Sequence, residues 1–237
     1  TLLKIPLLIF GTVLVVKAQT PPNPPPSVGE TVKYEALWVP AVRDLGQLIL
    51  SSFKLTYCAY AACESIAILA ACYNTPLSES TLAFLTRDPS TARNVRMTGV
   101  WLLGCGFMYA GSIIRLLCYR AMGEHFTWEL TVRKGHRLVT GGPYAVVRHP
   151  SYVGSAVKYA GLVLAHFGPG SWYAECVGWS TPLSKVFVAA SVGWSAMASI
   201  MLVARIGRED EVLRKEFGSE WEAYARRTSY RLVPFVY

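Results

Sequence analysis

Two polar clusters hold the residues of this chain whose types and spacing could do chemistry. Residues 135–152 read GHRLVTGGPYAVVRHPSY, with cationic, imidazole and phenol side chains among glycines and prolines. Residues 205–211 read RIGREDE, with two arginines beside three acids. The glycines and prolines favour a fixed, non-helical loop whose backbone N–H groups are free for a ligand. Charges of both signs suit a ligand that is zwitterionic or carries several polar groups.

A helical hairpin is the element that must bring these clusters together. The apolar runs 151–167 and 186–206 lie between the clusters, and antiparallel helices joined by a short connection place their outer ends side by side. We therefore predict one mixed-charge pocket at the membrane interface. The members that the two clusters supply are Arg137, Arg148, Arg205, Arg208, His136, His149, Tyr144, Tyr152, Glu209, Asp210 and Glu211.

The composition indicates a membrane protein. Hydrophobic residues make up 52% of the chain and charged residues only 16%, whereas a soluble domain carries about a quarter charged residues. The net charge of +8 would suit nucleic acid, but the basic residues lie between apolar runs and not on a stripe with interleaved aromatics. This distribution is typical of the cytosolic loops of a membrane protein, so no nucleic-acid partner is expected.

Five apolar segments, each near the roughly 20 residues that a membrane-spanning helix needs, divide the chain. They are residues 1–17, 45–73, 97–118, 151–167 and 186–206. The sequence therefore predicts an all-α, multi-pass integral membrane protein with about five transmembrane helices. The first segment could instead be the core of a signal peptide.

Two regions follow from this division. Residues 1–118 are predicted to hold the N-terminal transmembrane helices, with a proline-rich linker at 18–29 that cannot be helical. Residues 119–237 are predicted to form the binding and catalytic region, with the helical hairpin 151–206 and an amphipathic cytosolic tail helix.

The distribution of positive charge predicts the orientation. The connection 119–150 and the tail from residue 205 are rich in arginine, whereas the connection 168–184 carries a single charge, which is acidic. The positive-inside rule puts the first two on the cytosolic side. Counting backwards puts residues 18–44 in the cytosol and residues 74–96 outside, although the latter hold three arginines that oppose the rule.

Other residues of the apolar runs have simpler interpretations. Glu64 interrupts the second run, and a carboxylate there is either functional or has a structural partner. The six cysteines form no CxxC pair and no Cys/His spacing fits zinc, so we expect packing residues and no metal site. The third run contains small residues expected to permit close helix contact, namely Gly99, Gly104, Gly106 and Gly111.

At the two polar clusters the chain resembles the integral-membrane methyltransferases typified by protein-S-isoprenylcysteine carboxyl O-methyltransferase. The resemblance rests on HRLVTGGPYAVVRHPSYVG at 136–154 and RIGREDEVLRKEFGSEWEAY at 205–224, with LVPF near the end. These stretches occur in the family's order and around a hydrophobic hairpin. The resemblance covers residues 125–237, and the N-terminal half matches only as apolar spans.

The resemblance implies S-adenosylmethionine as cofactor, held in a cytosol-facing pocket. It places the cofactor contacts on Glu129, His136, Arg137, Leu138, Val139, Tyr144, His149, Pro150, Ser151, Tyr152 and Glu209. It places the contact to the carboxylate of a prenylated C-terminal cysteine on Arg205, with Arg148 as the other candidate for this catalytic role. The expected partners are prenylated membrane-associated proteins and the lipid bilayer, and the expected location is the endoplasmic reticulum membrane.

Two other functions remain open from the sequence. A related phospholipid N-methyltransferase would methylate an amine, whose ammonium must first lose a proton; the candidate bases are Glu64, Glu129 and His149. A membrane adaptor that keeps the scaffold without catalysis would need no intact cluster of arginines and acids. Methylation of a carboxylate needs no base, since that group is already ionised at neutral pH.

Overall fold

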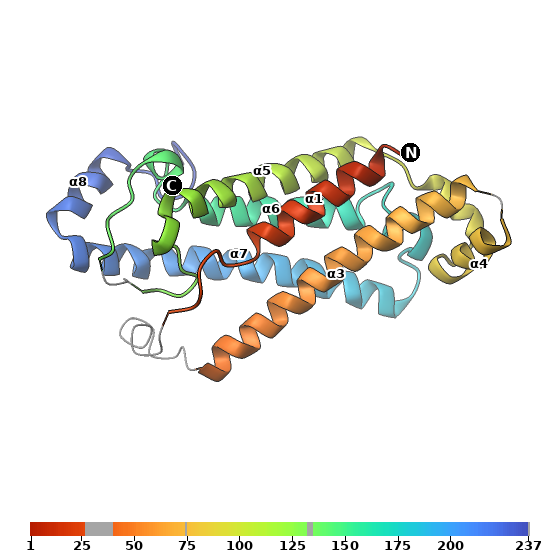
Figure 1. Cartoon of the computed structure of the whole chain (residues 1–237), viewed down its shortest axis with the longest axis horizontal. Coiled ribbons are helices and arrows are strands. Elements are labelled where there is room, and N and C mark those ends of the chain that lie inside the picture. Colours follow the sequence, from red (N-terminus) through yellow and green to blue (C-terminus); the bar gives the residue numbers. More distant parts are fainter. Residues whose placement is uncertain (27–39, 74, 132–134, 237) are drawn as a thin grey trace.

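The computed structural model describes residues 1–26, 40–73, 75–131 and 135–236, and within them the chain has no β-strand. The predicted all-α class is confirmed. The helices form an elongated bundle (Figure 1). They are α1 (Lys4–Ala18), α3 (Pro40–Cys72), α4 (Pro76–Leu85), α5 (Gly99–Met122), α6 (Pro150–Phe167), α7 (Pro182–Phe217) and α8 (Ser219–Arg227). Short helical turns connect them at Pro89–Asn94, Gly123–His125, Gly142–Ala145 and Tyr173–Val177.

Three segments of the described residues are long and apolar enough to cross a membrane, namely Asp44–Cys72, Gly99–His125 and Pro182–Phe217. The predicted count of about five is therefore not confirmed. The other two predicted spans form α1 and α6, which are shorter. With 15 residues, α1 rises about 22 Å, less than the roughly 30 Å of a hydrocarbon core. The 18 residues of α6 include Lys158 and His166, which interrupt its apolar surface.

The second polar cluster lies inside a helix and not after one. The apolar run 186–206 was expected to end before the cluster, yet α7 continues through it to Phe217. Residues 208–217 are mostly good helix formers, so the chain stays helical where its hydrophobicity stops. The helix ends at Gly218, whose φ of 51° lies in the left-handed region that favours glycine. The tail helix predicted from the sequence is thus divided between α7 and α8.

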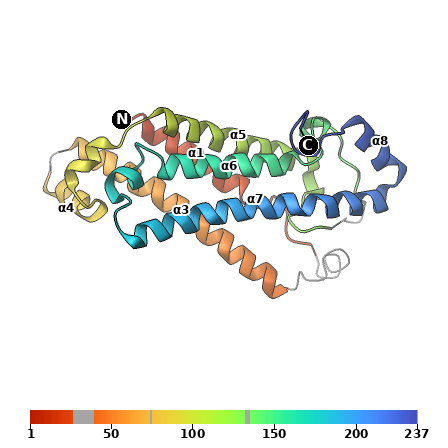
Figure 2. The same ribbon diagram turned by 180° about the vertical axis from the view of Figure 1, so that it is seen from behind.

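Helices α5 and α6 pack so closely that glycine is required at their contact. A Cβ on Gly111 would lie 2.4 Å from Lys158 N, and one on Gly161 would lie 2.4 Å from Met108 N. Gly104 and Gly111 thus act as the sequence predicts. The same prediction is wrong for Gly99 and Gly106, where a Cβ would meet nothing within 4 Å. Figure 2 shows α7 running along α6 on the side away from α5.

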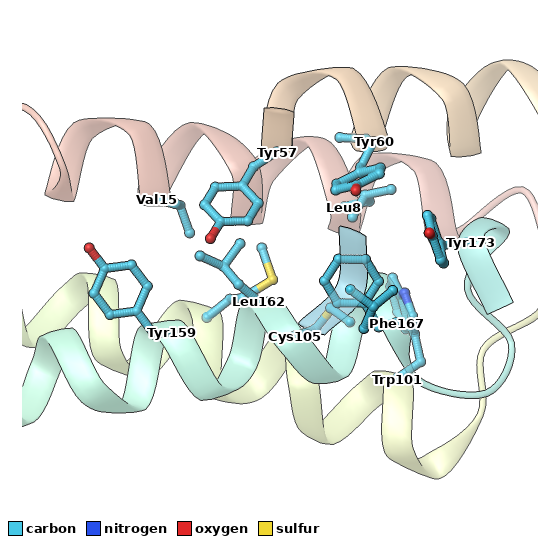
Figure 3. Packing of buried hydrophobic residues seen from close by; sticks show 14 residues of the cluster. Leu8, Val15, Tyr57, Tyr60, Trp101, Cys105, Tyr159, Leu162, Phe167 and Tyr173 are labelled. Atoms are coloured by element: carbon cyan, nitrogen blue, oxygen red, sulfur yellow. The ribbon is translucent and has the colours of Figure 1, made fainter. Parts of the chain in front are cut away.

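Aromatic side chains fill the core between α1, α3, α5 and α6 (Figure 3). Tyr57 and Tyr60 of α3 face Leu162 and Phe167 of α6, with Leu8 of α1 beside them. The Tyr60 ring makes an edge contact with Phe167 at 5.6 Å between centroids. Large rings in edge contact contribute apolar burial together with favourable quadrupole geometry. This core holds α1 and α3 against the close pair α5 and α6.

The connections gather at two opposite ends of the bundle (Figure 1). At one end, Asn23 donates to Gly123 O at 2.8 Å, so the chain after α1 lies beside the chain after α5. At the other end, Arg96 N donates to Gly170 O at 3.1 Å and Arg87 donates to Thr181 at 3.1 Å. The sequence predicts that residues 18–44 share one side with residues 119–150, and that residues 74–96 share the other side with residues 168–184. The described residues of these connections are grouped in this way. Residues 27–29 of the predicted linker and residues 132–134 of the connection 119–150 lie outside those residues.

A buried ion pair joins α1 and α3 at the far end of the bundle, which is the end where the connection between α6 and α7 lies. Lys4 Nζ lies 2.8 Å from Glu64 Oε1 and donates to Gly170 O at 2.6 Å. The other oxygen of Glu64 accepts from Trp172 N at 2.8 Å. Both charged residues are buried, so each provides the other's compensation. Of the two interpretations of Glu64, the structure supports the structural partner.

Removing one charge of this pair should destabilise the protein strongly. In Glu64→Gln the Lys4 ammonium stays buried with no anion, and breaking a buried pair typically costs about 3–5 kcal/mol. We expect a clear fall in the unfolding temperature of the detergent-solubilised protein. The exposed residue Glu79 offers the matched control, and Glu79→Gln should unfold like wild type. Equal unfolding temperatures for Glu64→Gln and Glu79→Gln would contradict this account of the pair.

Candidate active site

A cavity of about 250 Å³ lies at the end of the bundle where α5, α6 and α7 meet the chain that follows α5. Its wall takes side chains from both polar clusters, as the hairpin geometry predicts. The sequence-predicted residues on this wall are Glu129, His136, Leu138, Val139, Tyr144, Arg148, His149, Ser151, Tyr152, Arg205 and Glu209. Their individual roles stay predictions.

Two predicted contacts do not reach the cavity wall. Pro150 occupies the first position of α6, where its missing N–H leaves no helical hydrogen bond unmade. Its fixed φ starts the helix that carries Ser151 and Tyr152. Arg137 is exposed. The structure therefore gives Pro150 a role in positioning its neighbours and brings no Arg137 side chain to the site.

Glu209 is the acid of the second cluster that faces the cavity. Its carboxylate accepts a hydrogen bond from the Tyr152 hydroxyl on α6. Its Oε2 lies 3.9 Å from His149 Nδ1 and 3.9 Å from Arg205 Nε. Because Arg205 stands four residues earlier on α7, both side chains share one helix face. The acid is thus fixed in place and can accept hydrogen bonds from a ligand's ammonium or hydroxyl groups.

Asp210, the next residue, is buried behind the cavity and ties three segments together. Its Oδ1 lies 3.1 Å from His149 Nε2. Its Oδ2 lies 3.3 Å from Arg231 Nε and 3.7 Å from Arg148 Nη1. These charge-assisted contacts connect α7 to the start of α6 and to the C-terminal segment. Asp210 therefore positions His149, and it is absent from the cavity wall.

The C-terminal segment packs over the start of α6. Arg148 N donates to Tyr230 O at 3.0 Å, and His149 N donates to Arg231 O at 2.9 Å. The Arg148 guanidinium also lies over the Trp221 ring, 5.7 Å from its centroid. These contacts give Arg148 a structural role beside its place on the cavity wall. A ligand that binds the Arg148 side chain has to compete with these contacts.

Arg205 connects α7 to the loop after α5. Its Nη1 donates to Trp128 O at 2.6 Å, and a fifth of its side chain is exposed. The planar guanidinium can serve a carbonyl on one edge and a ligand on another, which an ammonium cannot do with the same geometry. Arg205 therefore holds Glu129, the residue after Trp128, near the second polar cluster.

Tyr144 supplies a hydroxyl donor to this site. Burial raises the pKa of its phenol well above the usual value of 10, because desolvation disfavours the phenolate and the nearby Cys118 and Glu209 add to the effect. The hydroxyl therefore stays protonated at neutral pH, and it donates to Met122 Sδ at 2.9 Å. Tyr224 of α8 donates to Tyr144 O at 2.9 Å and fixes the turn that carries it.

Two cations on the cavity wall were missed by the sequence reasoning. Arg115 of α5 and Lys158 of α6 are both buried and line the cavity. The signal was present, because an ionisable residue inside an apolar run is a functional candidate by default. That rule was applied to Glu64 alone. The hydrogen bonds of Arg115 run to Ser151 and Ser155, the residues that follow the first polar cluster on α6.

The remaining polar groups of the wall fit a ligand that joins a heteroaromatic ring to charged groups. His125 Nδ1 and Trp128 Nε1 are buried without a hydrogen-bond partner among the described residues. The rings of His125 and His136 stack at 4.6 Å between centroids, which offers a flat surface. Glu129 is buried on the same wall. No group of three or more His, Cys, Asp or Glu side chains within the described ranges could hold a metal ion.

The fold and the site define a helical membrane protein with a polar cavity at one end of its bundle. Comparison with known proteins narrows this class. Residues 102–173, which span α5 to the start of the Tyr173–Val177 turn, match the model of the Isoprenylcysteine carboxyl methyltransferase (ICMT) family. The resemblance drawn for residues 125–237 is thereby confirmed over the first cluster and α6, and the match extends back into α5.

Curated relatives fall into two groups. Protein-S-isoprenylcysteine O-methyltransferase B of Arabidopsis thaliana is 30% identical over 135 residues, 56% of this chain and 58% of that protein. The protein-S-isoprenylcysteine O-methyltransferase of Dictyostelium discoideum is 25% identical over 135 residues, 56% of this chain and 49% of that protein. A Delta(14)-sterol reductase of Schizosaccharomyces pombe is 27% identical over 110 residues, 46% of this chain and 21% of that protein. The chain thus spans about half the length of the two methyltransferases and a fifth of the reductase.

The position of Glu209 leads to a prediction about ligand binding. Glu209→Gln should weaken binding of a cationic, hydroxyl-bearing cofactor by roughly ten- to a hundredfold, because a charge-assisted hydrogen bond is worth about 1.5–3 kcal/mol. Calorimetry with S-adenosylmethionine measures the dissociation constant. Binding of a lipidic acceptor should change less.

Two further variants separate ligand contact from packing. Glu211→Gln removes an acid that is exposed and paired with Lys215 at 2.6 Å, so it should bind the cofactor like wild type. Tyr152→Phe removes the hydroxyl that donates to Glu209 but keeps the charge. A loss in Tyr152→Phe as large as that in Glu209→Gln would show that the acid acts through the tyrosine and not on the ligand.

Proposed function

We propose that this chain is a membrane methyltransferase that transfers a methyl group from S-adenosylmethionine to the C-terminal carboxylate of a prenylated cysteine. The observation that carries the proposal is a cavity that gathers residues of both polar clusters at one end of the helical bundle. The ICMT family match over α5 and α6 supports it, as do the methyltransferase relatives. The proposal makes prenylated membrane-associated proteins the partners.

The cavity wall fits S-adenosylmethionine. In our proposal Glu129 and Glu209 attract its cationic and hydroxyl groups, and the stacked rings of His125 and His136 face its adenine. The unpartnered donor Trp128 Nε1 lies on the same wall. When bound, the cofactor supplies a sulfonium methyl group that passes to a carboxylate oxygen while the sulfur keeps the electron pair and no proton moves.

The residues of the chain have to orient the reactants and exclude water, because the methyl acceptor needs no activation. A C-terminal carboxylate has a reference pKa of about 3.3–3.7 and is ionised at neutral pH. Arg205 is proposed to position this carboxylate, and the buried wall keeps water away from the reacting atoms. The cavity is slightly smaller than the roughly 300–1,000 Å³ of ordinary small-molecule sites. The prenyl chain must therefore extend beyond it.

The apolar part of the wall indicates where that chain would lie. Leu50 of α3 and Ala198 and Leu202 of α7 line the cavity on the side of the apolar helices. A lipidic acceptor would reach the site from the bilayer between these helices, and the cofactor would reach it from the loop-bearing end. We place that end in the cytosol on the positive-inside rule, and the protein in the endoplasmic reticulum membrane.

Methylation of a phospholipid amine is less well supported. It needs a base, and of the three candidate bases Glu64 is paired with Lys4 beside the connection between α6 and α7, away from the cavity. His149 is held by Asp210. Glu129 lines the cavity and is the remaining candidate.

Reduction of a lipid double bond is a second candidate, favoured by the sterol reductases among the relatives. It would need a hydride donor in place of a methyl donor. The matched stretch covers a fifth of the reductase but about half of each methyltransferase. The similarity to the methyltransferases therefore extends over a larger share of the relative.

The reaction product distinguishes these functions. Membranes that contain the protein should transfer labelled methyl from S-adenosylmethionine to N-acetyl-S-farnesylcysteine, and mild base should release the label because the product is a methyl ester. Base-stable methylamine formed from phosphatidylethanolamine would favour the phospholipid reaction. Absence of methyl transfer together with nicotinamide-dependent reduction of a sterol would contradict the proposal.

The proposed role of Arg205 can be tested with a conservative change. Arg205→Lys keeps the positive charge and the long stem but loses the planar fork that serves Trp128 O and a carboxylate together. We expect kcat/KM for the prenylated acceptor to fall by about tenfold or more, the loss of a charge-assisted hydrogen bond, with cofactor binding retained.

Arg208 is the matched control for this change, because it lies three residues later on α7 and is exposed. Arg208→Lys should keep wild-type kinetics. If Arg205→Lys also turns over like wild type at low acceptor concentration, Arg205 is an interfacial anchor and does not position the acceptor.

A further inference from the structure

Lys158 is a buried lysine on the cavity wall that has no acidic partner among the described residues. It lies eight residues into α6 from Pro150, about 12 Å along the helix axis from the first polar cluster. The residue is 1% exposed, and its Nζ lies 4.2 Å from the centroid of the Tyr159 ring. Among the described residues no hydrogen-bond acceptor or carboxylate meets its ammonium group. The Tyr159 ring alone compensates part of the charge.

Arg115 adds a second positive charge on the same part of the wall. Its Nε donates to Ala18 O at 2.8 Å, and its Nη2 donates to Tyr119 Oη at 2.7 Å. Its Nη1 donates to the hydroxyls of Ser151 and Ser155. All of these acceptors are neutral, so they satisfy the guanidinium's hydrogen bonds and leave its charge uncompensated.

The other cations of the wall are balanced by acids. Arg205 lies 3.9 Å from Glu209, and Arg148 lies 3.7 Å from Asp210. The acid beside Arg205 offsets its charge, so Arg205 can orient a carboxylate by hydrogen bonding, as proposed above, but compensates little of that carboxylate's charge. The excess of positive charge falls at Lys158, on the part of the cavity that α5 and α6 form within the apolar bundle. A charge buried there is costly until an anion compensates it.

We propose that Lys158, with Arg115 behind it, binds the carboxylate of the methyl acceptor. This inference rests on the proposed function and adds to it the residue that compensates the acceptor's charge. An ammonium is a point donor that can hold one carboxylate oxygen and leave the other free to receive the methyl group. A lipidic acceptor arrives from the apolar side of the cavity, the side on which Lys158 lies. The cofactor's own charged groups face Glu129 and Glu209 nearer the loops.

The test compares an acid with its neutral amide. Purified protein in detergent is titrated with N-acetyl-S-farnesylcysteine and with the corresponding carboxamide, which has the same prenyl chain and no charge. Wild-type protein should bind the acid roughly ten- to a hundredfold more tightly than the amide. In Lys158→Met this preference should fall to within about threefold, while the affinity for the amide stays unchanged. Lys158→Arg should keep most of the preference.

Lys185→Met is the matched control, since Lys185 is exposed on α7 and its replacement should leave the preference at the wild-type value. A cooperative unfolding transition in detergent verifies that each variant is folded, and its binding of S-adenosylhomocysteine should be unchanged. If Lys158→Met shows no such transition, Lys158→Gln is used in its place, with the same expected loss of preference.

The possible outcomes separate the inference from the function on which it rests. A wild-type preference that survives in both Lys158→Met and Lys158→Gln overturns the role of the lysine alone. Folded variants that lose affinity for S-adenosylhomocysteine but keep the acid preference show that the anion belongs to the cofactor, which also overturns it. Wild-type protein that does not prefer the acid to the amide overturns the proposed function itself.

Discussion

The close contact of α5 and α6 is the constraint on which the rest of the structure depends. Backbone meets backbone at Gly111 and Gly161, where any Cβ would clash. This approach lets the short side chains of Ser151 and Ser155 reach the Arg115 guanidinium across the contact. It also fixes the start of α6, and with it the first polar cluster, against α5. The stretch that matches the ICMT family, residues 102–173, contains both helices of this contact.

Charge burial distinguishes the two ends of the bundle. At the far end Lys4 and Glu64 compensate each other and bind the backbone of the connection between α6 and α7, so their charges support the fold. At the cavity end Lys158 is buried, and the part of the chain that the structure describes offers it no such partner. Since the hydrocarbon interior makes an uncompensated charge costly, a cation kept there is expected to meet an anionic ligand. The same physical rule therefore indicates a structural pair at one end and a binding site at the other.

The sequence predicts the helical class and the assembly of the site, because both follow from periodic and local signals. Two polar clusters around an apolar hairpin had to meet, and Tyr152 does bond Glu209 across it. It does not predict that α7 continues to Phe217, since the apolar run ends eleven residues before the helix does. Nor can it say which glycines face a neighbour, because Gly104 and Gly106 differ only in the side of α5 that they occupy. The structural roles of Arg148 and Glu64 depend on partners distant in the chain.

The central claim is that one cavity receives both the methyl donor and the lipidic acid. A structure of the protein with S-adenosylhomocysteine and N-acetyl-S-farnesylcysteine measures this directly. We predict density for the nucleoside beside His136 and Glu209, with the acid's carboxylate between the sulfur and Lys158 and its prenyl chain against Leu202. Density for either ligand outside the cavity, or a carboxylate directed toward the solvent-facing loops, would contradict the claim.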